Sequence, residues 1–407
     1  MTSEIQPAYS KQRIRYAVLS IFIAQGLCFA SWASRLPDIK KDFNVESYLH
    51  YGLLMFLLPM GKFIAIPAVG FLLPRLGSKK TVLISIIGYA LSLFLVSIVP
   101  GITGLGITLF LFGIFWNMTD ISLNTQAIEV ERIYGKPIIA TFHASWSLSA
   151  CIGAIIGYSM INLNVITFYH FLGMTLLAIA IVMLNYKYLQ EPAKAVEKEE
   201  NLNVAQGSKA KTGKLHLPES LLIQLGLVWL LALIVENTMF EWSDVYFQSV
   251  IKAPESLQVG FLVFMVMMFA GRMLTNFAYT IWQKKTVLQI AGALIFAGFI
   301  ISSLFIGYSD ALITKVIITS IGFMLIGLGI SCVVPTIYSI VGDKAKTPVG
   351  TALTIMSSIS FVGPFISPLL VGSVSDAYGP KWAYLIMSIV GLLIIAAVSL
   401  DRKSTRL

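Results

Sequence analysis

The feature that most constrains this chain is a succession of long apolar stretches separated by short polar connections. Twelve such stretches lie near residues 15–35, 49–73, 82–99, 104–128, 138–161, 166–189, 219–243, 257–281, 286–308, 312–340, 349–374 and 380–400. Each is close to the ~20 residues that an α-helix needs to cross a bilayer. Because lipid offers no hydrogen bonds to the backbone, the expected structure is an all-α integral membrane protein with twelve transmembrane helices.

Composition excludes the main alternatives. Only 12% of the 407 residues are charged and 57% are hydrophobic, whereas a soluble domain carries about 25% charged residues. The three cysteines have no paired spacing, which excludes a disulfide scaffold and a cysteine-ligated metal site. The net charge of +9 does not indicate nucleic acid, because almost no polar surface remains to bind it. The expected surroundings are a lipid bilayer.

The order of the apolar stretches predicts two halves. A polar stretch rich in Lys and Glu separates six spans from six, so we expect an N-terminal six-helix half at 1–189, a cytoplasmic linker at 190–217 and a C-terminal six-helix half at 218–407. Connections on one side hold 21 Lys and Arg residues, and those on the other side hold 6. The positive-inside rule then places both termini on the cytoplasmic side of an inner (cytoplasmic) membrane. A monomer is expected.

Four charged residues lie well inside predicted spans, away from the span ends. Lys62 lies near the centre of the second span, Asp120 in the fourth, Glu236 in the seventh and Arg272 in the eighth. A charge at this depth costs several kcal/mol and usually serves a substrate or ion pathway. Asp120 and Glu236 are therefore the predicted proton-coupling residues, with Lys62 and Arg272 as possible counter-charges. The alternative is buried ion pairs that only hold helices together.

Polar and aromatic residues accompany these charges. Asn117, Asp120 and Asn124 recur at helical spacing and so share one face. Amides that orient a solute and aromatic rings that stack on it are typical of a site for a small polar molecule. The predicted substrate-binding residues are Gln25, Trp32, Lys62, Asn117, Asn124, His143, Trp146, Ser147, Asn237, Phe240 and Tyr338. The alternatives are interfacial anchoring for Trp and Tyr and a purely structural His.

Sequence motifs do not indicate an enzyme. There is no phosphate-cradling glycine loop, no cluster of His, Cys and carboxylates at metal spacing, and no G-x-S-x-G nucleophile motif. We therefore expect no catalytic residues, no cofactor and no metal.

A short segment between the second and third spans resembles a family signature. Residues 70–80, GFLLPRLGSKK, are similar to the G-x-x-x-D-R-x-G-R-K motif of the major facilitator superfamily. The resemblance implies a six-plus-six fold with pseudo-twofold halves and a gating role for Gly70, Arg75, Gly77 and Lys79. Arg272 is the weak counterpart in the second half. Pro74 stands where the motif has its acid, so the usual carboxylate of the gate is missing here.

Further motifs resemble one bacterial branch of that superfamily. The segments around Asp120 and Asn124, around His143 and Trp146, and from Glu241 to Tyr246 are similar to fucose permease and to MosC-like permeases of rhizopine clusters. The Asp120 and Asn124 spacing resembles the acid and amide of the fucose–proton symporters. Those symporters also carry an acid near the end of the first span, and residues 31–37, SWASRLP, have none. The resemblance therefore does not transfer the identity of a sugar.

The sequence thus predicts a secondary active transporter working by alternating access, with symport of protons and a small polar solute such as a sugar or cyclitol. A proton-driven exporter of amphipathic compounds is the alternative, favoured by Met265, Met267 and Met268 in the eighth span. A non-transporting membrane partner is a third possibility.

Overall fold

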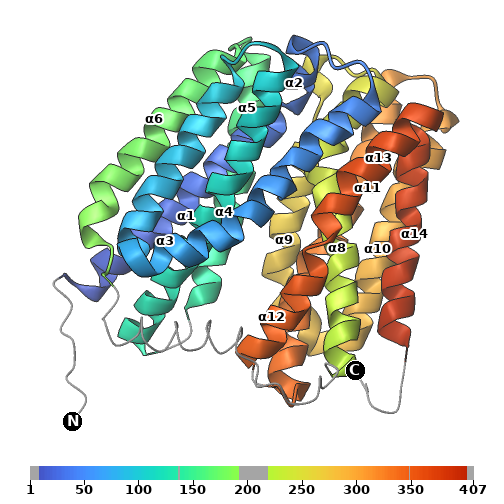
Figure 1. Cartoon of the computed structure of the whole chain (residues 1–407). Helices are drawn as coiled ribbons and strands as arrows, with labels where there is room; N and C mark the ends of the chain where they lie inside the picture. The colour runs from blue at the N-terminus through green and yellow to red at the C-terminus, as the bar shows by residue number, and fades with distance from the viewer. Residues whose placement is uncertain (1–8, 136–137, 192–218, 348, 401–407) are drawn as a thin grey trace. The chain divides into compact units, whose positions relative to one another are not determined.

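The computed structural model describes residues 9–135, 138–191, 219–347 and 349–400, and its regular elements are all helical. Figure 1 shows the helices in chain order. The first are α1 (Lys11–Ser34), α2 (Leu36–Asp42), α3 (Tyr48–Val96), α4 (Gly101–Tyr134), α5 (Ile139–Asn162), α6 (Thr167–Asn185) and the 3-10 turn η1 (Tyr186–Tyr188).

The remaining elements follow the stretch 192–218, which is outside the described residues. They are α8 (Ser220–Tyr246), the π-helical turn η2 (Phe247–Ile251), η3 (Glu255–Leu257), α9 (Gly260–Ile281), α10 (Lys284–Leu304), η4 (Phe305–Tyr308), α11 (Leu312–Lys344), α12 (Val349–Ser360), α13 (Gly363–Tyr378) and α14 (Pro380–Ser399).

The helices account for the predicted spans. Eleven helical segments of the described chain are long and apolar enough to cross a membrane. One of them, α3, is 49 residues long and consists of two helices that meet at Gly77, where φ is +74°. The segment thus supplies two spans, and α12 with α13 supplies one. The prediction of an all-α fold with twelve spans is confirmed.

Contacts between Cα atoms divide the chain into two compact units. The first contains residues 1–32, 57–153 and 165–216, and the second contains 33–56, 154–164 and 217–407. The end of α1, the start of α3 and the end of α5 thus belong with the C-terminal helices. The predicted halves at 1–189 and 218–407 were divided by chain order alone, and this division stays a prediction. All but the first two residues of the predicted linker, 190–217, lie outside the described residues.

Small residues bring the helices of the first unit together. A Cβ on Gly26 of α1 would lie 2.6 Å from the Trp146 carbonyl oxygen of α5, so these backbones touch. In the same unit Thr175 of α6 donates a 2.7 Å hydrogen bond to the Ala90 carbonyl of α3. Close approach through small residues is how membrane helices associate where lipid removes the hydrophobic driving force.

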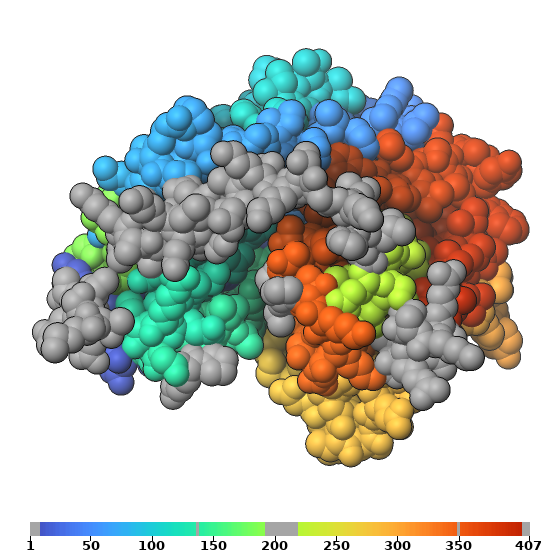
Figure 2. All heavy atoms as spheres, turned by 60° about the horizontal axis from the view of Figure 1, so that its bottom comes forward, coloured from blue at the N-terminus to red at the C-terminus, as the bar shows by residue number. Residues whose placement is uncertain are grey.

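The second unit is packed in the same way. Helix α10 packs against α11 and α14, and α8 packs against α12, α13 and α14. A Cβ on Gly292 would lie 2.7 Å from the Gly391 carbonyl oxygen, which sets the close approach of α10 and α14. Figure 2 shows the α9–α10 connection (gold) and the α11–α12 ends (orange) on one face of this unit. The Lys284–Asp343 ion pair joins these two connections.

Candidate functional site

Asp120 of α4 is the centre of a polar network in the first unit. The Gln25 side-chain amide of α1 donates a 2.5 Å hydrogen bond to Asp120 Oδ1. The Trp116 side chain, one turn earlier on α4, is a second hydrogen-bond partner of the carboxylate. Gln25 is fully buried and Asp120 half-buried. Asp120 is therefore held from two directions at a depth where a carboxylate is costly unless it is bonded.

Lys62 of α3 brings a positive charge to the same network. Its ammonium lies 3.2 Å from the centre of the Trp116 ring, and its charge acts on the Asp120 carboxylate. A cation over an indole face is attracted by the negative ring face. The structure thus joins Gln25, Lys62 and Asp120 through Trp116, a residue that was not among the predicted site residues.

The two asparagines of the predicted α4 stripe bond to the backbone. Asn117 Nδ2 donates a 2.6 Å hydrogen bond to the Lys62 carbonyl oxygen of α3. Asn124 Nδ2 donates to the Asp120 carbonyl oxygen of its own helix at 2.8 Å. Asn117 therefore positions the backbone that carries Lys62, while Asn124 is bonded within α4.

Aromatic side chains surround the Asp120 network. Phe29 of α1 lies 4.9 Å from Trp116 and stacks on Trp146 of α5 at 5.5 Å, centroid to centroid. Trp32 packs against Phe29 and Phe112, and Tyr89 stacks on Phe112 at 4.4 Å. The buried Trp32 Nε1 and Tyr89 hydroxyl have no hydrogen-bond partner in the described part of the chain.

The predicted α5 residues are placed differently from one another. His143 is exposed and meets the Phe22 ring edge-on at 5.8 Å. Ser147 is buried and donates a 3.1 Å hydrogen bond to the His143 carbonyl oxygen. Trp146 is the α5 residue that the structure joins to the aromatic cluster through Phe29.

A second charged cluster lies in the second unit. Arg272 Nη2 of α9 is 3.6 Å from Glu236 Oε1 of α8, and both side chains are largely buried. The same guanidinium nitrogen is 3.9 Å from the Met268 sulfur. Glu236 is thus paired with a cation from the neighbouring helix.

Other predicted residues of this unit lie around α8. Asn237 Nδ2 donates a 2.8 Å hydrogen bond to Glu241 Oε1, and Glu241 is 2% exposed. Phe240 packs edge-on against Phe264 at 5.8 Å. Tyr338 of α11 meets Trp229 edge-on at 5.5 Å and is 44% exposed. Glu241 was named in the α8 motif but not among the predicted site residues.

The predicted gating segment forms the bend of α3. Gly77 adopts the positive φ at which the two helices meet, a conformation that favours glycine. The Arg75 guanidinium lies 3.2 Å from the centre of the Phe71 ring and donates to the Phe71 carbonyl oxygen. Lys79 lies 5.1 Å over the Tyr186 ring. Gly70 has open space where a Cβ would be. Arg75 thus bonds to its own helix at this bend.

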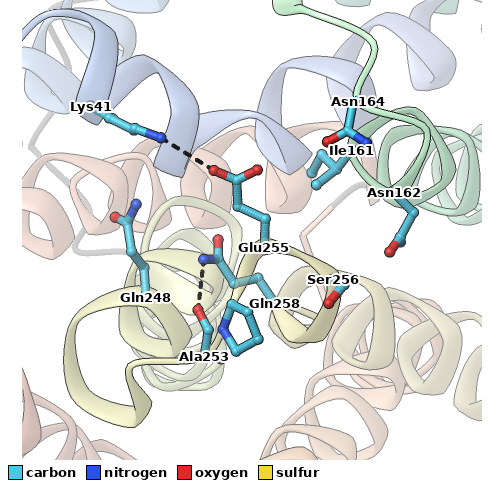
Figure 3. A pocket seen from close by; sticks show the side chains of 10 residues that line it. Lys41, Ile161, Asn162, Asn164, Gln248, Ala253, Glu255, Ser256 and Gln258 are labelled. Atoms are coloured by element: carbon cyan, nitrogen blue, oxygen red, sulfur yellow. Dashed lines mark hydrogen bonds and ion pairs between the residues drawn. The ribbon is translucent and has the colours of Figure 1, made fainter.

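A polar pocket of about 610 Å³ opens in the second unit, away from the predicted residues (Figure 3). Its lining comes from the ends of α2 and α5, from η2 and η3 and from the connections beside them: Lys41, Ile161, Asn162, Asn164, Gln248, Ala253, Pro254, Glu255, Ser256 and Gln258. Lys41 and Glu255 form an exposed ion pair of 3.3 Å at its edge. Sequence analysis missed this pocket because its residues lie in connections and span ends.

The described residues contain no group of three or more His, Cys, Asp and Glu side chains placed to hold a metal ion. The two clusters offer hydrogen bonding, charge pairing and aromatic contacts by the chain's own side chains.

The comparison with protein families decides the identity. Residues 17–349 match the Major Facilitator Superfamily. The chain belongs to this superfamily. Membership confirms the resemblance seen in residues 70–80 and makes the chain a multi-pass membrane transporter.

Relatives with full-length similarity are also transport or membrane proteins. The chain is 27% identical to the uncharacterized transporter y4wD of Sinorhizobium fredii over 92% of this chain and 94% of the relative. It is 23% identical to the membrane protein MosC of Rhizobium meliloti, over 95% of this chain and 90% of that protein. The resemblance to MosC-like proteins is thus confirmed.

Solved structures share the fold. The D-xylose-proton symporter has a TM-score of 0.72 at 14% identity, covering 97% of this chain and 98% of that chain. The nucleoside transporter NupG has a TM-score of 0.71 at 14% identity, covering 95% of this chain and 100% of that chain. At this identity the likeness establishes the major facilitator fold and leaves the solute open.

Proposed function

We propose that this transporter couples the uptake of a small polar solute, sugar- or cyclitol-like, to protons by alternating access. The observation that carries the proposal is the Asp120 network, in which a half-buried carboxylate is bonded by Gln25 at 2.5 Å and acted on by Lys62. Two solved structures of the same fold are described as a proton symporter for D-xylose and a transporter of nucleosides, both for small polar solutes.

The network has the parts that proton coupling needs. Desolvation favours the neutral form of a carboxylic acid, whereas a nearby cation or hydrogen-bond donor favours the ionised form. Asp120 is subject to both influences. A change in its hydration or in the position of Lys62 would therefore change whether its carboxyl group binds or releases a proton. Glu236 is less suited, because its carboxylate is already paired with the Arg272 guanidinium at 3.6 Å. We therefore assign proton coupling to Asp120 before Glu236.

The solute would bind beside this network. Gln25, Lys62 and Trp146 offer an amide, a cation and an aromatic face to a polar ring. Asn117 acts indirectly, through the Lys62 backbone. The charge distribution of the sequence supports a transporter with both termini in the cytoplasm of a bacterial inner membrane, and a monomer is sufficient for the proposed cycle.

The test uses proteoliposomes with an imposed pH gradient and a solute found by thermal-shift screening at two pH values. Asp120→Asn keeps the shape and hydrogen bonding of the side chain but cannot release a proton. We expect loss of gradient-driven accumulation with retained solute exchange. Full accumulation by this variant would remove Asp120 from the role, and loss of exchange as well would indicate a binding or folding role. Asp310→Asn, at an exposed carboxylate, is the control.

The exporter alternative rested on three methionines of α9. Met265 and Met268 are fully buried in packing, so they do not offer a flexible lining for large amphipathic compounds. This placement favours the polar-solute proposal. The same proteoliposomes distinguish the two, because an exporter would expel solute toward the acidic side.

A further inference from the structure

The start of α3 and the end of α13, both in the second unit, are joined by an extended backbone contact. A Cβ on Gly372 would lie 2.9 Å from the Tyr48 carbonyl oxygen and 3.2 Å from the Gly52 Cα. Further along, the Phe56 and Phe365 rings pack edge-on at 5.5 Å. Residue numbers rise on α3 as they fall on α13, so the two helices run antiparallel and in direct contact over this stretch.

The carboxylate of Asp376 forms hydrogen bonds at one end of the contact between α3 and α13. Ser47 caps α3, since its hydroxyl oxygen accepts the His50 N–H at 3.2 Å. The Ser47 hydroxyl donates to Asp376 Oδ1 at 2.9 Å, and the Tyr48 N–H donates to the same oxygen at 3.1 Å. Asp376 of α13 thus completes the capping of a helix more than 300 positions earlier. A negative charge at a helix N-terminus is stabilised by the helix dipole.

The contact is anchored on α8 as well. The Tyr51 side chain is 1% exposed, and its hydroxyl donates a 2.7 Å hydrogen bond to the Glu241 carbonyl oxygen. Its ring meets the Trp242 ring edge-on at 4.8 Å. The first turns of α3 are therefore held by Asp376 at the surface and by α8 in the interior.

The chain can bend just after this contact. Residues up to Phe56 belong to the second unit, and residues from Leu57 belong to the first. Pro59 follows inside α3 and has no N–H, so the Met55 carbonyl lacks its usual helical bond. A proline at a unit boundary is a natural point for one part of a helix to move relative to the rest.

We propose that Asp376 is a gating residue, whose capping of α3 holds the α3–α13 contact closed and whose release opens this end of the transport path. The proposal rests on the proposed alternating-access function. Both ends lie in connections for which the charge distribution predicts the outer side of the membrane. Because Asp376 is exposed, its bonds compete with water and can be broken and remade in each cycle.

The test measures distances between spin labels in the purified full-length protein. Labels replace the exposed His50 and Tyr378 in a Cys332→Ala background, since Cys28 and Cys151 are buried. Asp376→Ala should raise the longer-distance population about fivefold, the effect of losing one N-cap. Gly372→Val should act in the same direction, because its side chain would meet the α3 backbone. Two control variants should leave the distances unchanged: Asp310→Ala, at an exposed carboxylate 4.0 Å from Lys315, and Gly173→Val, where a Cβ would meet no other atom within 4 Å.

Two results would overturn the proposal. If both test variants keep the parent distance distribution, the contact does not open. If Asp376→Ala lowers the melting temperature without a longer-distance population, the residue is only a structural cap. The measurement needs neither solute nor a pH gradient, so a failure of proton coupling would leave this result intact.

Discussion

At the residue scale, the charges of Lys62 and Asp120 are the pair whose interaction can be tested most directly. An ammonium inside a membrane span needs a carboxylate partner or a water-filled cavity. In the structure the Lys62 ammonium lies over Trp116, and its charge acts on Asp120. Removing either charge leaves the other in a partly desolvated site, which is costly.

This geometry predicts non-additive stability effects. Lys62→Met should lower the free energy of unfolding more than the double variant Lys62→Met with Asp120→Asn, because the double variant leaves no uncompensated charge. The coupling energy should be about 1 to 3 kcal/mol, typical of residues in one network. Thermal unfolding in detergent measures it. Simple additivity would mean that the two side chains do not interact.

At the element scale, Glu219 ties the start of α8 to the segment before α12. The Thr347 N–H and hydroxyl both donate to Glu219 Oε1 at 2.6 Å. The Thr347 hydroxyl bond, the amides of Lys346 and Thr347 and the Lys346 charge hold the pKa of Glu219 below its ordinary value of 4.5, against a smaller effect of burial. The ionised form is therefore favoured in the folded protein.

The sign of the pH dependence follows. The pKa of Glu219 is lower in the folded protein than in the unfolded chain. Ionised Glu219 therefore stabilises the folded protein at pH values above its pKa in the unfolded chain. This stabilisation is lost as the pH falls through the pKa of the folded protein. We expect the melting temperature to fall between pH 7 and pH 4, and Glu219→Gln to reduce that difference. Glu46→Gln, at an exposed carboxylate, should behave like the parent. An equal pH dependence in all three proteins would exclude a role for Glu219.

At the scale of the whole molecule, topology is the prediction with the widest consequence. The Lys and Arg counts of 21 and 6 predict that both termini and the linker face the cytoplasm. Reporters fused after Lys209 and at the C-terminus should both be active only on the cytoplasmic side. A periplasmic signal at either position would contradict the six-plus-six arrangement. A reporter in the connection near Lys381 should give the opposite signal.

The sequence by itself determined that the chain spans a membrane twelve times and belongs among transporters. Hydropathy is local, since each stretch of about 20 apolar residues meets the bilayer requirement without reference to any other part of the chain. The break between the second and third spans, where Gly77 bends α3, could be predicted for the same reason, because polar residues interrupt the apolar sequence there. Asp120, Lys62 and Glu236 were found because a charge within an apolar stretch stands out in the sequence alone.

Only the tertiary structure decided which side chains meet. Gln25 bonds to Asp120 across 95 positions, and Tyr51 reaches the Glu241 backbone across 190. Asn124 shares the predicted face with Asp120 yet bonds to its own helix. Trp116 looks like any other span residue in the sequence, but packing places it between Lys62 and Asp120. Such contacts depend on how close two backbones come, which is set by small residues on both helices together.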